Sequence, residues 1–156
     1  MPSWIPKKII SGGQTGVDRA ALDWAISRVI DHGGWCPRGR LAQDGCLPSR
    51  YLLRETLSSG YSQRTRLNIE EADATLLVHF GPLMGGSELT QRLAFKLAKP
   101  LALFDASQPW SGQIVSMQTW LSSNSSHVLN IAGPSAQRHP GIYETTLKVL
   151  DQLFSK

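Results

Sequence analysis

The stretch ATLLVHFGPLMGGSELTQRLAFKLA, residues 74–98, carries the clearest fold signal in the sequence. Its first seven residues, 74–80, form a largely apolar run of strand length, which is typical of strands buried in parallel sheets. A glycine-rich loop follows at 81–86, and residues 87–98 place Leu89, Leu93 and Leu97 at the spacing of one helix face. Strand, glycine loop and helix in this order predict one unit of an α/β fold.

Strands and helices alternate along the rest of the chain as well. The sequence predicts four further strands, at 8–11, 35–36, 101–104 and 127–132. It predicts five further helices, at 16–30, 48–57, 64–72, 112–121 and 142–154. Such alternation favours a three-layer α/β sandwich, in which helices cover both faces of a mostly parallel sheet of about five strands. No repeat or linker is evident, so residues 1–156 are expected to form a single domain.

The composition excludes several classes of protein. Of the 156 residues, 41% are hydrophobic and 18% are charged, which excludes intrinsic disorder. Two cysteines are too few for a disulfide scaffold. The N-terminus lacks an apolar signal core, and no apolar run is long enough to cross a membrane. We therefore expect a cytoplasmic protein with no membrane partner.

The excess positive charge lies in one segment, residues 36–66. This segment contains six arginines, no lysine and two acidic residues, a balance that equals the net charge of the whole chain, +4. The arginines are Arg38, Arg40, Arg50, Arg54, Arg64 and Arg66. Because guanidinium groups bind phosphate or carboxylate through two parallel hydrogen bonds, the cluster predicts an anionic small-molecule ligand. A solvated basic surface is the alternative. The patterns typical of nucleic-acid binding are missing, so no nucleic-acid partner is expected.

Two glycine loops, at residues 11–19 and 81–90, lie between a predicted strand and a helix. Glycine lets the backbone approach a ligand, and the following helix N-terminus offers free amide groups with a partial positive charge. Each loop is therefore a candidate phosphate-binding loop, although either could be a plain strand-to-helix turn. Thr15 and Asp18 also have capping-box-like spacing. Neither loop is a P-loop, and no acidic residue ends the second strand, so a standard NAD site is not expected.

Four carboxylates are candidates for chemistry or structure. Asp18 and Glu88 each lie just inside a helix that follows a glycine loop, where a carboxylate could bind hydroxyl groups or act as a general base. Alternatively, both only stabilise the positive end of a helix dipole. Asp44 lies in the arginine-rich segment. Asp73 precedes its strand, at the edge of the sheet away from ligands, and is expected to be structural.

The cysteines and histidines give weaker signals. The spacing of Cys36 and Cys46 fits no zinc site, so no metal centre is predicted. Cys36 ends a predicted strand at the expected ligand edge, which leaves a reactive thiol or a metal contact as alternatives. His79 and His127 lie in apolar strands and are expected to be core residues.

Several motifs resemble a known family. They are GGQTGVDRAALD at 12–23, GWCPRGR at 34–40, Asp44-Gly45, Pro48-x-Arg50-Tyr51, Arg64-Thr65, Asn68, DATL at 73–76, and GGS-x-LT at 85–90. Together they resemble the family labelled "putative molybdenum carrier proteins", the circularly permuted YpsA-related branch of the SLOG superfamily. The resemblance extends from about residue 9 to at least residue 133.

The resemblance implies a Rossmann-like fold that binds nucleotides or nucleotide-derived ligands. The molybdenum-carrier label implies another ligand, the molybdenum cofactor, which is a pterin that carries a phosphate. Some relatives are phosphoribohydrolases with a Gly-Gly-x-Gly-Thr-x-x-Glu motif. Residues 12–18 invert the Gly-Thr order of this motif and end in aspartate, and residues 85–88 lack the rest of it. N-glycosidic hydrolysis is therefore kept as an alternative function, and sensing of a nucleotide signal as another.

We expect this protein to bind a phosphate-bearing small ligand, of the molybdenum cofactor type or a nucleotide derivative, as a molybdenum carrier would. The residues expected to contact the ligand are Gly12, Gly13, Gln14, Thr15, Gly16, Arg19, Arg38, Arg40, Arg50, Arg64, Gly85, Gly86, Ser87 and Thr90. Asp18 and Glu88 would be catalytic if the protein is an enzyme. A homo-oligomer is also expected, with Trp4, Trp110 and Trp120 as candidate apolar surface residues.

Overall fold

A central sheet of five strands organises the computed structural model, which describes residues 4–154. Its order is β2-β1-β9-β7-β8, and every neighbouring pair is parallel. The strands are β1 (Lys8–Ile10), β2 (Asp31–Gly33), β7 (Ala74–His79), β8 (Leu101–Asp105) and β9 (Val128–Ala132). The predicted parallel five-stranded sheet is thus confirmed.

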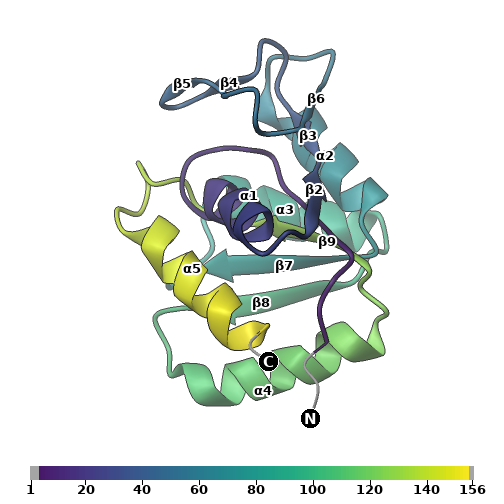
Figure 1. Cartoon of the computed structure of the whole chain (residues 1–156), viewed down its shortest axis with the longest axis vertical. Coiled ribbons are helices and arrows are strands. Elements are labelled where there is room, and N and C mark those ends of the chain that lie inside the picture. Colours follow the sequence, from purple (N-terminus) through teal and green to yellow (C-terminus); the bar gives the residue numbers. More distant parts are fainter. Residues whose placement is uncertain (1–3, 155–156) are drawn as a thin grey trace.

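Helices cover both faces of this sheet, which makes the fold a Rossmann-like α/β sandwich (Figure 1). The helices are α1 (Val17–Ser27), α2 (Tyr61–Glu71), α3 (Gly86–Lys96), α4 (Trp110–Ser123) and α5 (Ile142–Leu153). Helices α1, α4 and α5 pack together on one face, and α2 packs with α3 on the other. The larger hydrophobic core lies between the sheet and the first group, where Leu76, Val78 and Ile131 meet Trp24 and Leu150.

The segment between β2 and α2 differs from the prediction. No helix forms at 48–57; instead there are the short strands β3 (Trp35–Cys36), β4 (Leu41–Ala42), β5 (Gly45–Cys46) and β6 (Arg54–Glu55). The guanidinium group of Arg40 explains the difference, because it donates hydrogen bonds to carbonyl oxygens of Pro48, Tyr51 and Leu53. A helix over 48–57 would use the Pro48, Tyr51 and Leu53 carbonyls for its own amides. This segment projects from the sheet at the top of Figure 1.

The second strand of the central sheet is 31–33, not 35–36 as predicted. Gly34, with φ +126°, turns the chain out of the sheet directly after β2. A Cβ at Gly34 would lie 2.3 Å from the carbonyl oxygen of Ser11, so the turn needs glycine. Cys36 is consequently outside the central sheet, in the small β3–β6 pair.

Gln113 of α4 covers the free edge of the sheet at the end of β8. Its Oε1 accepts a hydrogen bond of 2.8 Å from the Asp105 amide, and its Nε2 donates one of 2.9 Å to the Asp105 carbonyl. These are the two backbone hydrogen bonds that a further strand would make with Asp105.

Two predictions about surface and core residues need correction. Trp4, Trp110 and Trp120 are partly buried against the larger core, so they are not free apolar surface residues. His79 is buried as predicted, whereas His127 is exposed. Within residues 4–154, no helix is both long and apolar enough to cross a membrane.

Candidate functional site

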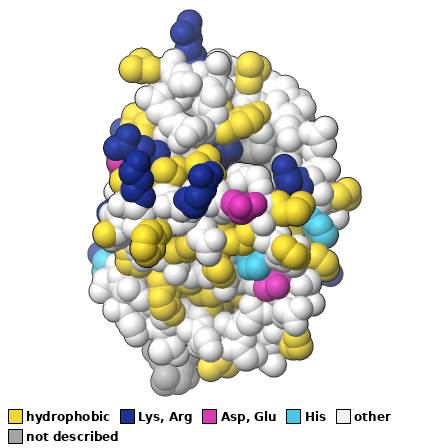
Figure 2. Space-filling view, turned by 180° about the vertical axis from the view of Figure 1, so that it is seen from behind, with side chains coloured by type: hydrophobic (Ala, Val, Ile, Leu, Met, Phe, Trp, Pro, Cys, Tyr) yellow, Lys and Arg dark blue, Asp and Glu magenta, His cyan; other side chains and the backbone are white. Residues whose placement is uncertain are grey.

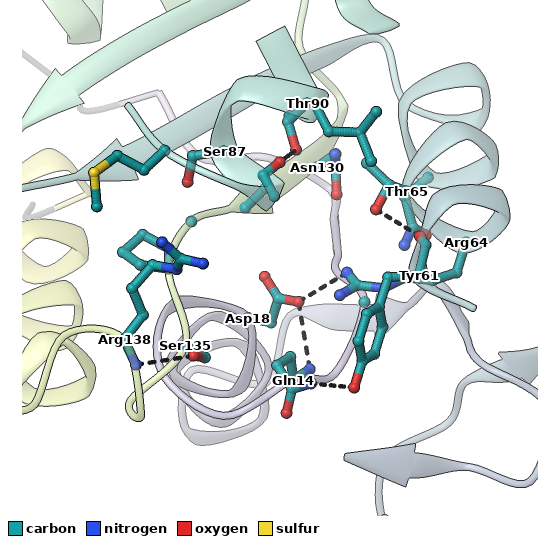
Figure 3. A pocket seen from close by; sticks show the side chains of 18 of the residues that line it. Gln14, Asp18, Tyr61, Arg64, Thr65, Ser87, Thr90, Asn130, Ser135 and Arg138 are labelled. Carbon is teal, nitrogen blue, oxygen red and sulfur yellow. Dashed lines mark hydrogen bonds and ion pairs between the residues drawn. The ribbon is translucent and has the colours of Figure 1, made fainter. Parts of the chain in front are cut away.

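A cavity opens at the carboxyl edge of the sheet, beside β7 and β9. These neighbouring strands lead into helices on opposite faces, α3 and α5, and such a reversal is where ligands bind in open α/β sheets. The cavity, here called the main cavity, has a volume of about 190 Å³. Its walls come from the β1–α1 loop, helix α2, the start of α3 and the loop after β9 (Figure 3).

Buried polar side chains concentrate at the main cavity. Of the twelve buried polar or charged residues in the described part of the chain, six line it. They are Gln14, Asp18, Asn68, Ser87, Thr90 and Asn130. Burying polar groups is costly unless each is hydrogen-bonded, so their gathering around one open space indicates a site for a polar ligand.

Asp18 and Arg64 form a buried ion pair in the cavity wall. Their Oδ2 and Nη1 atoms are 3.1 Å apart, and the side chains are 4% and 14% exposed. Burial raises the pKa of Asp18, although Arg64 and the amide of Gln14 act in the opposite direction. The second oxygen of the Asp18 carboxylate points into the cavity (Figure 3). One oxygen thus fixes Arg64 while the other is available to a ligand.

Three amide groups of the first glycine loop make hydrogen bonds within the protein. The Gly13 amide donates to Ser11 Oγ at 3.4 Å, and the Gln14 amide donates to Asp18 Oδ2 at 3.3 Å. The Thr15 amide donates to Gln14 Oε1 at 3.0 Å. Helix α1 has no side-chain cap, so the capping-box interpretation of Thr15 is wrong. This loop contributes the Gln14 and Asp18 side chains to the cavity.

The second glycine loop has free amides at the start of α3. Gly85 is the N-cap residue, without a side-chain cap, and its φ is +55°. Among the described residues, no acceptor receives a hydrogen bond from the Gly86 or Glu88 amide. Gly86 and Ser87 line the main cavity. The α3 N-terminus therefore offers donors and a partial positive charge to an anion in the cavity.

Arg138, from the loop after β9, lies over this helix start. A Cβ at Gly85 would be 2.8 Å from Arg138 Nη2, so the glycine makes room for the guanidinium group. The Arg138 side chain reaches across the cavity mouth towards Ser87 (Figure 3). Within the described residues, Arg138 has no ion-pair partner. Its positive charge is therefore uncompensated beside the free amides of α3.

The structure brings only part of the predicted site together. Seven predicted residues line the main cavity: Gly12, Gln14, Asp18, Arg64, Gly86, Ser87 and Thr90. The others lie outside its lining: Gly13, Thr15, Gly16, Arg19, Arg38, Arg40, Arg50, Gly85 and Glu88. Glu88 is exposed on α3, so it does not share the cavity with Asp18.

Most arginines of the basic segment have other partners. Arg19, which precedes the segment, makes a two-armed ion pair with Asp44 of the segment and also donates to the Gly13 carbonyl. Arg50 pairs with Asp23 at 3.3 Å. Arg38 is exposed and outside the cavity lining. Figure 2 shows that most basic side chains on the α2 face lie in its upper half, where this segment projects. The segregated charge is thus mainly a surface and folding feature, and Arg64 is its one member in the cavity lining.

Several cavity residues were not among the predicted ligand contacts, and the signals for them differ. Asn130 is a polar residue within the apolar run of β9; its Nδ2 donates to Thr75 Oγ1 at 3.2 Å. Asn68 belongs to the motifs that carry the family resemblance, and its side-chain amide makes hydrogen bonds with both backbone groups of Trp35. Tyr61 and Arg138 have no local signal, because only the tertiary fold places them at the cavity.

The remaining candidates have structural surroundings. Cys36 is fully buried, and burial raises the pKa of its thiol, which disfavours the reactive thiolate. Asp73 accepts a hydrogen bond of 2.8 Å from the Val128 amide at the amino end of the strands, as expected for a structural residue. In the described part of the chain, no three histidine, cysteine or acidic side chains are grouped as a metal site would need.

The fold defines the chain as a Rossmann-like α/β protein, and comparisons with known proteins define its family. Residues 9–154 match the family described as "Circularly permutated YpsA SLOG family", so the chain belongs to this family. A search of curated proteins returned no match.

A crystal structure from Syntrophus aciditrophicus, named "Putative molybdenum carrier protein", is similar over almost its whole length. It is 44% identical, with a TM-score of 0.93, and the match covers 97% of this chain and 96% of that one.

Proposed function

We propose that this protein binds a phosphate-bearing small molecule in the main cavity. The observation that carries the proposal is the convergence of the free α3 amides and the unpaired Arg138 on a cavity lined by buried polar side chains. The phosphate would be bound at the α3 N-terminus by these amides and Arg138. Asp18, Asn130 and Thr90 would bind hydroxyl groups or ring nitrogens deeper in the cavity.

The name of the similar Syntrophus protein supports one class of ligand. That protein is named a molybdenum carrier. If this chain also carries molybdenum, the molybdenum cofactor, a pterin with a phosphate, would fit the proposed phosphate site. A nucleotide derivative has the same features, namely a phosphate, hydroxyl groups and a flat ring. The proposal therefore concerns the phosphate-bearing class, with the molybdenum cofactor and nucleotide derivatives as its two members.

Analysis of the co-purified ligand tests the proposal first. The purified protein would be denatured, and the released small molecules examined by mass spectrometry and pterin fluorescence. A pterin phosphate would identify a carrier of the cofactor type, and a nucleotide or sugar phosphate would identify the other member. The proposal fails if nothing is released and calorimetry shows no binding of inorganic phosphate, ribose 5-phosphate, AMP or neopterin monophosphate.

Two arginine variants then locate the phosphate. Arg138→Ala removes an unpaired guanidinium group at the cavity and is expected to weaken binding of ribose 5-phosphate about 10- to 100-fold. Arg38→Ala removes an exposed guanidinium group outside the cavity and is expected to leave the dissociation constant within about twofold of the parent value. The opposite pattern would return the ligand to the basic segment around Arg38.

A second candidate function is hydrolysis of a nucleoside monophosphate, and Asp18 is the observation in its favour. Its carboxylate presents one oxygen to the cavity, and burial raises its pKa, as is common for general acids. Release of free base from a panel of nucleotides would be measured by chromatography. Asp18→Asn should lower the rate by several powers of ten if this function is real. A parent protein that releases no base would exclude it for those nucleotides.

A further inference from the structure

A second, smaller pocket of about 90 Å³ adjoins the main cavity. The two share four wall residues: Met84, Ser87, Pro134 and Arg138. The second pocket is completed by His79, Phe80, Pro82 and His139. Because the shared walls include Ser87 and Arg138, one ligand bound at the α3 N-terminus can extend in both directions.

The four residues that line only the second pocket differ chemically from the walls of the main cavity. No carboxylate lines the second pocket, and its unshared walls are side-chain rings rather than amides and hydroxyls. The Phe80 and His139 rings stack on each other, with centroids 4.4 Å apart and planes inclined by 26°. Phe80 nevertheless remains 47% exposed. A stacked pair with an open flank is a surface on which another flat ring can pack.

His79 adds a hydrogen-bonding group to the unshared walls of the second pocket. Its Nδ1 lies 2.7 Å from the Gly81 carbonyl oxygen, which can only accept, so Nδ1 carries the proton. Among the described residues, none makes a hydrogen bond to Nε2. Protein atoms do not completely enclose Nε2 either. In the neutral ring Nε2 is therefore a free acceptor. It suits a ring nitrogen or amino group that donates a hydrogen bond.

We infer that the second pocket binds the planar nitrogen heterocycle of the ligand, an inference that rests on the proposed phosphate binding in the main cavity. The heterocycle would stack on Phe80 and His139. His79 Nε2 would accept a hydrogen bond from a donor on the edge of the heterocycle. In a 5′-nucleotide, the base and the phosphate flank the sugar-ring oxygen, opposite the two hydroxyl groups. One nucleotide could therefore place its hydroxyl groups in the main cavity, its phosphate at the α3 N-terminus and its base in the second pocket. A purine and a pterin share this ring chemistry.

Calorimetry with matched ligands tests the inference on the intact chain. Ribose 5-phosphate is the ring-free reference, and AMP and neopterin monophosphate are the two ring-bearing probes. The parent is expected to bind at least one ring-bearing probe about tenfold more tightly than the reference, as one stacked base contributes. The probe that binds more tightly than ribose 5-phosphate shows whether the second pocket prefers a purine or a pterin. Phe80→Ala should reduce this preference to within about twofold, and Phe80→Tyr should preserve it.

Phe95→Ala is the matched control, because Phe95 is 89% exposed on α3 and outside both pockets. It should keep the parent's preference. The inference alone is overturned if ribose 5-phosphate binds but neither ring-bearing probe gains, or if Phe80→Ala keeps the preference. If no phosphate-bearing probe binds the parent, the proposed function fails and the inference fails with it.

Discussion

At the scale of single residues, the Asp18–Arg64 ion pair both lines the main cavity and contributes to the stability of the fold. Arg64→Ala would leave the Asp18 carboxylate buried without its cation. Breaking a buried ion pair in this way is expected to lower the free energy of unfolding by about 3–5 kcal/mol. Urea denaturation of the parent and the variant at pH 7 measures the loss.

Arg66 provides the internal control, since it lies on the same helix two residues further on. Its partner is Glu70 in an exposed i,i+4 pair, with Arg66 61% exposed. Arg66→Ala is therefore expected to cost about 0.5 kcal/mol or less. Equal losses for the two variants would show that burial of the Asp18–Arg64 pair has no energetic consequence.

The raised pKa of Asp18 predicts a pH dependence of stability. Because burial holds this pKa above its ordinary value of 3.8, the folded protein binds the proton more tightly than the unfolded chain. The contribution of Asp18 is complete below pH 3.8 and is lost as the pH rises through the folded pKa. Relative to Asp18→Asn, the parent should therefore lose stability as the pH rises above about 4. Urea denaturation of both proteins across this range measures the difference, and a constant difference would contradict the prediction.

At the scale of elements, the β1–α1 loop supports the ion pair through Gly12. A Cβ at Gly12 would lie 1.8 Å from Arg64 Nη1, so Gly12→Ala must displace the guanidinium group from Asp18. We expect a loss of about 3 kcal/mol in the free energy of unfolding. In the Arg64→Ala background the same substitution should cost little, because the clash is gone. Gly112→Ala in α4, where nothing lies within 4 Å, should be neutral or slightly stabilising. Additive costs of Gly12→Ala and Arg64→Ala would contradict this account.

Elements with purely local signals could be predicted from the sequence, and those set by distant contacts could not. Strand β7 and helix α3 follow from apolar patterns within residues 74–98. Residues 48–57 also have helix-like spacing, but Arg40 binds their carbonyl groups and holds them in an irregular segment. The side-chain pattern of that segment contains no sign of this competition.

The same division applies to the candidate site. Asp18 and Ser87 follow glycine loops and could be found from the sequence. Arg64 could be proposed only as one of several arginines, because its selection depends on how α2 packs against the β1–α1 loop. Arg138 comes to the cavity through the position of β9 between β1 and β7, which no local pattern reveals.

At the scale of the whole molecule, this strand order brings four distant chain segments together around one cavity. A ligand that contacts all four segments should therefore stabilise the whole fold. Ribose 5-phosphate at one hundred times its dissociation constant is expected to add about 2.7 kcal/mol. For a chain of this size, that corresponds to a rise of about 5–10 °C in Tm.

Differential scanning fluorimetry measures this rise in Tm, and two variants test where the phosphate binds. At the same ligand concentration, Arg138→Ala should show a much smaller rise. Arg92→Ala, an exposed arginine of α3 outside both pockets, should respond as the parent does. An equal rise in Arg138→Ala would place the phosphate elsewhere.

The contact between Gln113 and the end of β8 has a consequence for how chains meet. Exposed strand edges are where sheets of different molecules join into aggregates. By occupying both outward backbone groups of Asp105, one carboxamide makes the end of β8 unavailable to a strand from another copy. Gln113 thus prevents another strand from pairing with the end of β8. Any subunit contact made by this protein would need a surface other than that end of the sheet.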